Sequence, residues 1–178
     1  GEVIKVTGNV NGAYYGAVSA YNGSVDVNGD ISDSRALVSE YGGIATIRGD
    51  ITGSNYAIET SSGPGWIPPI VRVTGNVTGT GGSAINASNA ADIQITGNIT
   101  GTVLASGTDT TCPVITVNGD ITVSTGFGVS VYYGGTVTVN GSILGASPYL
   151  KLNDLNIGKD DYEISGDYLI YANNTVGD

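Results

Sequence analysis

The sequence lacks several residue types on which enzymes and small secreted scaffolds depend. It contains no histidine and no methionine, and one cysteine, one tryptophan and one phenylalanine among 178 residues. Without histidine, the commonest general base and metal ligand is missing. Because Cys112 is the single cysteine of the chain, it can form neither an internal disulfide nor a thiolate metal cluster. We therefore expect no bound metal and no other cofactor.

Basic residues are also scarce. Six Lys and Arg stand against sixteen Asp and Glu, and the formal net charge is −10. A surface of this charge repels phosphate backbones and anionic lipid headgroups. No apolar run reaches the roughly 18 residues that a membrane-spanning helix needs, and Gly1 to Val6 lack the features of a signal peptide. We expect a mature or excised piece without nucleic-acid partner or membrane insertion.

Small and polar residues dominate what is present. Gly, Asn, Thr and Ser make up 79 of the 178 residues, yet 40% of the chain is hydrophobic, mostly Val and Ile. These β-branched residues pack well on pleated sheets, and no window shows the apolar spacing of a helix. The composition therefore predicts a folded all-β chain and excludes a helical bundle.

A short pattern occurs seven times along the chain. It consists of an apolar residue, any residue, an apolar residue, a polar residue, Gly, then Asn or Asp (Ser in the last copy), then Val or Ile. Successive copies are separated by 21, 20, 26, 22, 22 and 22 residues, which is about one coil of a β-solenoid. The central glycines are Gly8, Gly29, Gly49, Gly75, Gly97, Gly119 and Gly141.

Each copy has the pattern of a strand, a corner and a second short strand. The apolar pair alternates with polar residues, and another apolar residue follows the glycine by two positions. A third apolar stretch lies upstream of several copies, as at Ala17–Ala20, Leu37–Glu40, Ala84–Ala87 and Gly128–Val131. Three sides per turn predict a triangular, single-stranded parallel β-helix of about seven coils of 20–22 residues over residues 1–148.

The two ends of the chain differ in sequence. Residues 149–178 carry more charge and short alternating segments, and we expect them to form a small C-terminal β cap. At the other end, Gly1 leads almost directly into the first repeat strand, so the first coil is expected to present an open edge. Head-to-tail self-association through this edge, leading to a filament, is one predicted outcome.

These repeats resemble the right-handed parallel β-helix of pectate-lyase-like and adhesin-like proteins. More narrowly, they are similar to secreted surface proteins of Gram-positive bacteria, through the repeat at Gly135–Ile143 and the tail at Asp161–Leu169. The resemblance implies an extracellular or cell-surface location and supports the right-handed sense expected for parallel connections. It leaves function open, because the fold hosts polysaccharide lyases, hydrolases and non-catalytic adhesins.

The number and positions of the basic residues favour a non-catalytic function. Lyases of this fold need a basic residue beside clustered carboxylates, and among the six basic residues only Arg48 and Arg72 fall on neighbouring coils near one wall. They occupy different offsets from their repeat glycines. A polysaccharide lyase or hydrolase is therefore the least favoured alternative.

The most regular polar feature is the position after the repeat glycine. Asp30 and Asp50 there would stack about 5 Å apart, as in a calcium site. The alternation of Asn with Asp along the column favours a structural role instead, in which side-chain oxygens hydrogen-bond the turn backbone without needing charge. This turn column comprises Asn9, Asp30, Asp50, Asn76, Asn98 and Asp120.

Aromatic residues provide the candidate binding site. Tyr21 and Tyr41 both lie eight residues before a repeat glycine, so they are expected to stack at a corner. Trp66 lies in a proline-stiffened loop in the 26-residue interval, and with Tyr41 and Tyr56 it is predicted to form a platform on which a sugar ring stacks. The alternative is that these rings only cover the solenoid wall.

The sequence thus predicts a non-catalytic extracellular surface module, adhesin-like or a structural spacer, whose exposed aromatic residues bind a glycan or cell-surface partner. The alternative from a different class is a self-assembling structural subunit.

Overall fold

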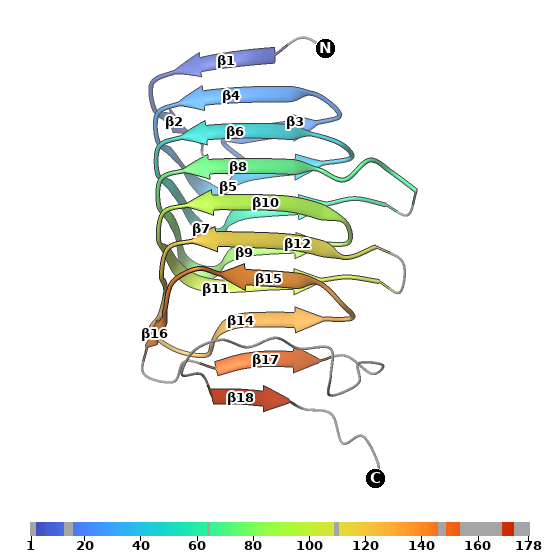
Figure 1. The fold of residues 1–178 in the computed structure, drawn as a ribbon. Helices are drawn as coiled ribbons and strands as arrows, with labels where there is room; N and C mark the ends of the chain where they lie inside the picture. The colour runs from blue at the N-terminus through green and yellow to red at the C-terminus, as the bar shows by residue number, and fades with distance from the viewer. Residues whose placement is uncertain are drawn as a thin grey trace.

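The computed structural model describes residues 3–12, 16–63, 65–108, 111–145, 149–153 and 169–172. Within them the chain forms β-strands and no helix, stacked as parallel coils along one axis (Figure 1). The predicted all-β parallel solenoid is confirmed. The seven repeats supply seven stacked strands, which delimit about six turns of the solenoid.

Sheet A is built from the apolar pairs of the seven repeats. Its strands pair in parallel and in strict register, one repeat beside the next, because every repeat places its apolar pair at the same offset from its glycine. In spatial order they are β1 (Val3–Thr7), β4 (Ser24–Asn28), β6 (Ile44–Arg48), β8 (Ile70–Thr74), β10 (Ala91–Thr96), β12 (Pro113–Asn118) and β15 (Thr136–Val139).

Sheet B contains the other two predicted sides, and all of its pairs are parallel. In the middle coils these sides are one long strand, interrupted by register shifts such as that between Asp33 and Arg35. Its strands are β2 (Val10–Asn11), β3 (Val18–Tyr21), β5 (Ile31–Glu40), β7 (Ile51–Ser61), β9 (Val77–Ser88), β11 (Ile99–Ser106), β13 (Ile121–Val123), β14 (Phe127–Tyr132), β16 (Ile143–Gly145), β17 (Tyr149–Asn153) and β18 (Leu169–Ala172).

The core consists mainly of columns of valine, isoleucine and alanine side chains that run along the axis. The two apolar positions of each repeat and the position two after its glycine point inward, as the alternation predicts. Since each coil buries its apolar side chains against the coils above and below, stability is shared along the stack. One fully buried column is Ile51, Val77, Ile99 and Ile121, in direct register.

The repeat glycines form a column of their own where sheet A turns into sheet B. A Cβ built on Gly75 would overlap the carbonyl oxygen of Gly49, and the same overlap recurs at the other repeat glycines from Gly29 to Gly141. The backbone of each coil therefore approaches the previous one too closely for any side chain. Gly75 also has φ of 150°, a region that side chains rarely adopt.

The two ends of the stack differ from its middle. Ile4 of β1 is 67% exposed, whereas its register partner Val25 in β4 is 7% exposed. At the other end β17 and β18 continue sheet B beyond β14 as parallel strands. Residues 154–168 and 173–178 of the expected cap lie outside the described residues, so the capping role stays a prediction. The right-handed sense of the solenoid also stays a prediction.

Substituting a repeat glycine tests the close approach. Gly75→Ala should lower the free energy of unfolding by more than about 1 kcal/mol, because the new methyl group meets backbone that cannot move aside. Gly23→Ala is the matched control, since a Cβ there finds only the Tyr21 carbonyl oxygen at 3.6 Å. Urea denaturation measures both variants, and equal losses would contradict the proposed origin of the glycine column.

Candidate functional site

Six turns lead from sheet B back into sheet A and lie above one another along one edge of the solenoid, which we call the loop edge (Figure 1). Two of these turns are long and project outward, and the other four contain two or three residues. In chain order the turns are residues 22–23, 41–43, 62–69, 89–90, 107–112 and 133–135.

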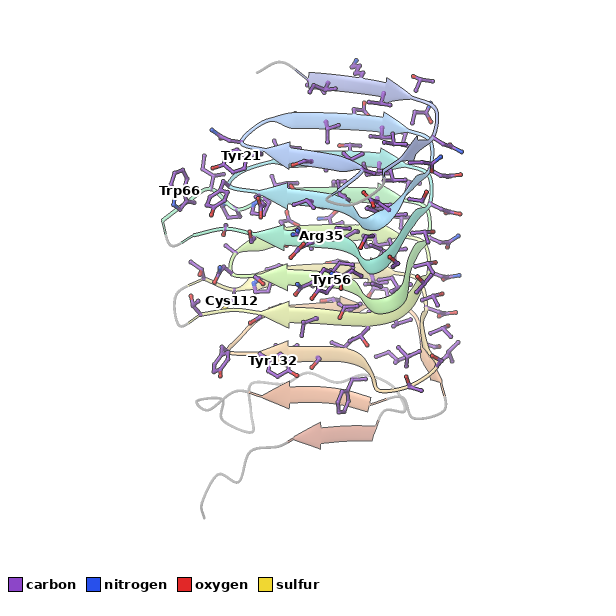
Figure 2. All side chains as sticks on the ribbon, turned by 180° about the vertical axis from the view of Figure 1, so that it is seen from behind. Tyr21, Arg35, Tyr56, Trp66, Cys112 and Tyr132 are labelled. Carbon is purple, nitrogen blue, oxygen red and sulfur yellow. The ribbon has the colours of Figure 1, made fainter. Side chains whose placement is uncertain are left out.

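Three aromatic rings from successive coils meet on the loop edge, one at the end of β3 and two in turns. The ring centroids of Tyr21 and Tyr41 are 5.1 Å apart at an angle of 50°, and those of Tyr41 and Trp66 are 5.3 Å apart at 80°. Tyr21 is 62% exposed and Trp66 57% exposed, while Tyr41 between them is half-buried. We call Tyr21, Tyr41 and Trp66 the aromatic cluster; Figure 2 shows Tyr21 and Trp66 at this edge.

The turn that carries Tyr41 is tightly fixed. Buried Ser39 donates its hydroxyl hydrogen to the Gly43 carbonyl at 3.1 Å, and the Gly43 N–H donates to the Glu40 carbonyl at 2.9 Å. Tyr41 itself has φ of 49°, in the left-handed region. Bulky residues rarely adopt this conformation, so the surrounding hydrogen bonds hold the ring in place at a cost in backbone strain.

The Trp66 loop is anchored to the next turn by two hydrogen bonds. The Ser62 hydroxyl donates to the Ala90 carbonyl at 3.0 Å, and the Asn89 side-chain amide donates to the Ser62 carbonyl at 2.6 Å. The indole then lies against Gly63, where a side chain would meet its ring atoms. The start of the loop is thus tied to the neighbouring turn, and the indole packs on its own loop and on Tyr41 while more than half of it stays exposed.

Tyr56 lies elsewhere. It is opposite Arg35 and Ser83 in sheet B, beside the register shift, and Figure 2 shows it away from Trp66. β7 continues for five residues beyond Tyr56, which carries the chain about 16 Å along the strand before the Trp66 loop begins. Tyr56 is therefore not part of the aromatic cluster, although it lies close to Trp66 in the sequence and was predicted to form the platform with Trp66 and Tyr41.

The turn column forms a continuous ladder of hydrogen bonds on the opposite edge. In each step, a side-chain oxygen of one coil accepts the backbone N–H of the equivalent residue in the next coil. The same geometry holds whether the acceptor is Asn or Asp. The pairs are Asn9–Asp30 (2.9 Å), Asp30–Asp50 (2.9 Å), Asp50–Asn76 (2.7 Å), Asn76–Asn98 (3.0 Å), Asn98–Asp120 (3.0 Å) and Asp120–Ser142 (2.8 Å).

The two arginines considered for catalysis are both paired on the outer face of sheet A. Arg48 forms an ion pair with Asp26, and Arg72 forms one with Asp92 and also donates to the Asp92 carbonyl at 2.9 Å. The two pairs extend in opposite directions along the axis, toward earlier and later coils respectively. In the described part of the chain, no three His, Cys, Asp or Glu residues are grouped so that they could hold a metal ion.

Other exposed apolar residues lie on or next to the loop edge, at different distances from the aromatic cluster, and the predicted site did not include them. Ile67 is 69% exposed and packs over Gly42, next to Tyr41. Ile44 and Val114 are exposed in one outward column of sheet A that adjoins the loop edge. Tyr133, which also lies eight residues before its repeat glycine, is exposed on the turn before β15.

No protein-family model, curated protein or solved structure matches this chain. The assignment to the β-helix repeat architecture therefore rests on the sequence pattern and the structure themselves. Among the described residues no helix could cross a membrane.

The ladder allows the roles of charge and hydrogen bonding to be separated at one position. Asp50→Ala removes the acceptor for the Asn76 N–H and should lower the free energy of unfolding by about 1 kcal/mol. Asp50→Asn keeps an oxygen in place and should leave stability nearly unchanged, with or without calcium. Thermal melts of both variants in calcium and in chelator measure this. A calcium-dependent loss in Asp50→Asn would instead indicate a metal site.

Proposed function

We propose that the protein is a non-catalytic extracellular surface module that binds carbohydrate through the aromatic cluster. The observation that carries this proposal is the meeting of three rings, from three successive coils, on an exposed edge. The apolar faces of sugars stack on such rings, while nearby hydroxyl and amide groups, such as those of Ser61 and Asn22, bond sugar hydroxyls. The solenoid serves as the rigid support that spaces and displays them.

The backbone of Tyr41 gives further support. Asn22 and Asn89 adopt the same left-handed conformation in other turns of the loop edge, with φ of 48° and 58°. Asparagine tolerates this region, whereas tyrosine there costs of the order of 1 kcal/mol or more. The contacts of the ring with its neighbours recover about 0.5–1.5 kcal/mol each. A tyrosine at this position is thus better explained by the contacts of its ring in the aromatic cluster than by the needs of the turn.

The cell-surface location and the adhesin-like relationship belong to this proposal. They are supported by the resemblance of the repeat at Gly135–Ile143 and of the tail at Asp161–Leu169, most of which lies outside the described residues. The non-catalytic role is supported by the pairing of Arg48 and Arg72, because each guanidinium is already engaged by a carboxylate. Cleavage of an acidic glycan that disappears in Arg48→Ala or Arg72→Ala would contradict it.

Loss of two rings should abolish binding without unfolding the chain. We expect the wild-type protein to bind members of an array of neutral glycans, and the double variant Tyr41→Asn with Trp66→Ala to lose at least about tenfold in affinity, since each stacked ring contributes about 1 kcal/mol. Asparagine is chosen at position 41 because the left-handed turn accepts it. The melting temperature should change little.

Tyr56→Ala is the control for this experiment. It removes a tyrosine from the same solenoid but from outside the aromatic cluster, so glycan binding should persist. Failure of the wild-type protein to bind any glycan on the array would overturn the proposal. A large fall in melting temperature of the double variant without any change in binding would show that the rings only cover the wall.

Self-assembly is a second candidate function, favoured by the exposure of inward-facing Ile4 on β1. A head-to-tail contact through this strand edge is heterologous and does not close, so it produces filaments. Electron microscopy of the concentrated protein distinguishes filaments from monomers. If filaments form, Ile4→Lys should dissolve them, because a charge at the end of the core column opposes stacking; monomers at every concentration would remove this candidate.

A further inference from the structure

The turn that presents Tyr41 occurs a second time on the loop edge. Residues 41–43 and 133–135 both have the sequence Tyr-Gly-Gly. Tyr133 has φ of 53°, against 49° for Tyr41, and the glycine that follows is left-handed in both turns, with φ of 92° at Gly134 and 79° at Gly42. Tyr133 is 55% exposed. The chain thus accepts the strain of a left-handed tyrosine twice on the same edge, once with a half-buried ring at Tyr41 and once with an exposed ring at Tyr133.

The two turns lie on the same edge of the solenoid. Tyr41 precedes the third repeat glycine and Tyr133 the seventh, so four coils separate them, about 19 Å at the usual strand spacing. Between them lie the Trp66 loop, the Asn89 turn and the loop at 107–112. This last loop packs directly on the Tyr133 turn, since a Cβ on Gly107 would meet the carbonyl oxygens of Tyr133 and Gly134.

The loop edge is almost without charge in a chain of net charge −10. By sequence its six turns contain one charged residue, Asp109. The adjoining Asp92 is paired with Arg72, and the adjoining Glu40 accepts a hydrogen bond from the Ser61 hydroxyl at 2.9 Å. An acidic ligand therefore finds no unpaired cation among the described residues of this edge, whereas an uncharged ligand finds aromatic rings, hydroxyls and amides.

The shape of the edge favours a thin ligand. Four of its six turns are only two or three residues long, the two longer ones project from it between the two Tyr-Gly-Gly turns, and the edge extends over several coils. A stable protein interface needs about 800 Å² on each partner, more readily supplied by a broad face than by a ridge. A single extended polymer chain lying along the ridge contacts rings at both ends without needing width.

We propose that Tyr133 forms a second sugar-binding subsite and that the ligand is an unbranched, uncharged polysaccharide lying parallel to the solenoid axis, from the aromatic cluster to Tyr133. This inference rests on the proposed carbohydrate binding and extends it to the class and orientation of the ligand. Two subsites joined by one ligand raise each other's effective concentration, so affinity depends on ligand length.

The test uses two size series, cello-oligosaccharides and chito-oligosaccharides from disaccharide to octasaccharide, titrated into the wild-type chain by calorimetry. In a series that binds, affinity should rise at least about tenfold once the oligosaccharide is long enough to span ~19 Å. Tyr133→Asn, which the left-handed turn accepts, should remove this gain and leave the affinity for the shortest binding member unchanged. Leu144→Asn, at an exposed residue on a different edge, is the matched control and should behave as wild type.

The possible failures are distinguishable. Binding that does not depend on length, or a length gain that survives Tyr133→Asn, overturns the second subsite and leaves carbohydrate binding at the aromatic cluster intact. Absence of binding in both series and on the whole glycan array overturns the proposed function and this inference together. Preferential binding of acidic oligosaccharides overturns the uncharged ligand class.

Discussion

The close approach of successive coils at the corner between sheet A and sheet B is the constraint on which the structure depends. At that corner the backbone of each repeat glycine lies against the carbonyl group of the glycine before it, leaving no room for a Cβ. The turn column beside it ties each coil to the next through a side-chain oxygen. Together the glycine column and the turn column fix the axial spacing and the register of the coils. Because every repeat has its apolar residues at the same offsets, this register aligns them in columns.

This corner also explains why variation is concentrated on the opposite edge. An insertion at the glycine corner would break the column and shift every later strand. The loop edge has no such column, so its turns range from two residues to the eight of residues 62–69 while sheet A stays in register on both sides. The solenoid thus has one edge of constant geometry that holds the stack together and one edge whose turns vary in length.

The same contrast between the glycine corner and the loop edge explains which features of the structure could be predicted from the sequence. The glycine period and the alternation of apolar residues predicted the strands of sheet A and the inward columns, because period-two patterns translate directly into sheet faces. The pairing of Tyr21 with Tyr41 followed from equal offsets. The position of Tyr56 did not, because it depends on where the long strand β7 ends.

The continuity of sheet B was equally hidden from sequence analysis. The sequence predicted these as two of three separate sides, yet backbone hydrogen bonding resumes after register shifts in β5, β7 and β11. The equivalence of Tyr41 and Tyr133 depends on backbone angles that the Tyr-Gly-Gly sequence suggests but does not determine. The position of a residue was thus predictable where it depends on a local sequence pattern, and not where it depends on residues that become neighbours only in the folded chain.

The hydrogen-bond ladder of the turn column has a direction, and this makes the repeat a modular unit. Every N–H in the ladder donates toward the preceding coil, so each internal repeat consumes one acceptor and supplies one. Duplication of the segment from one column residue to the next therefore leaves every donor matched. Only the last donor need not be Asn or Asp, and Ser142 occupies that place. The length of such a solenoid can change by whole repeats without any new chemistry at the joint.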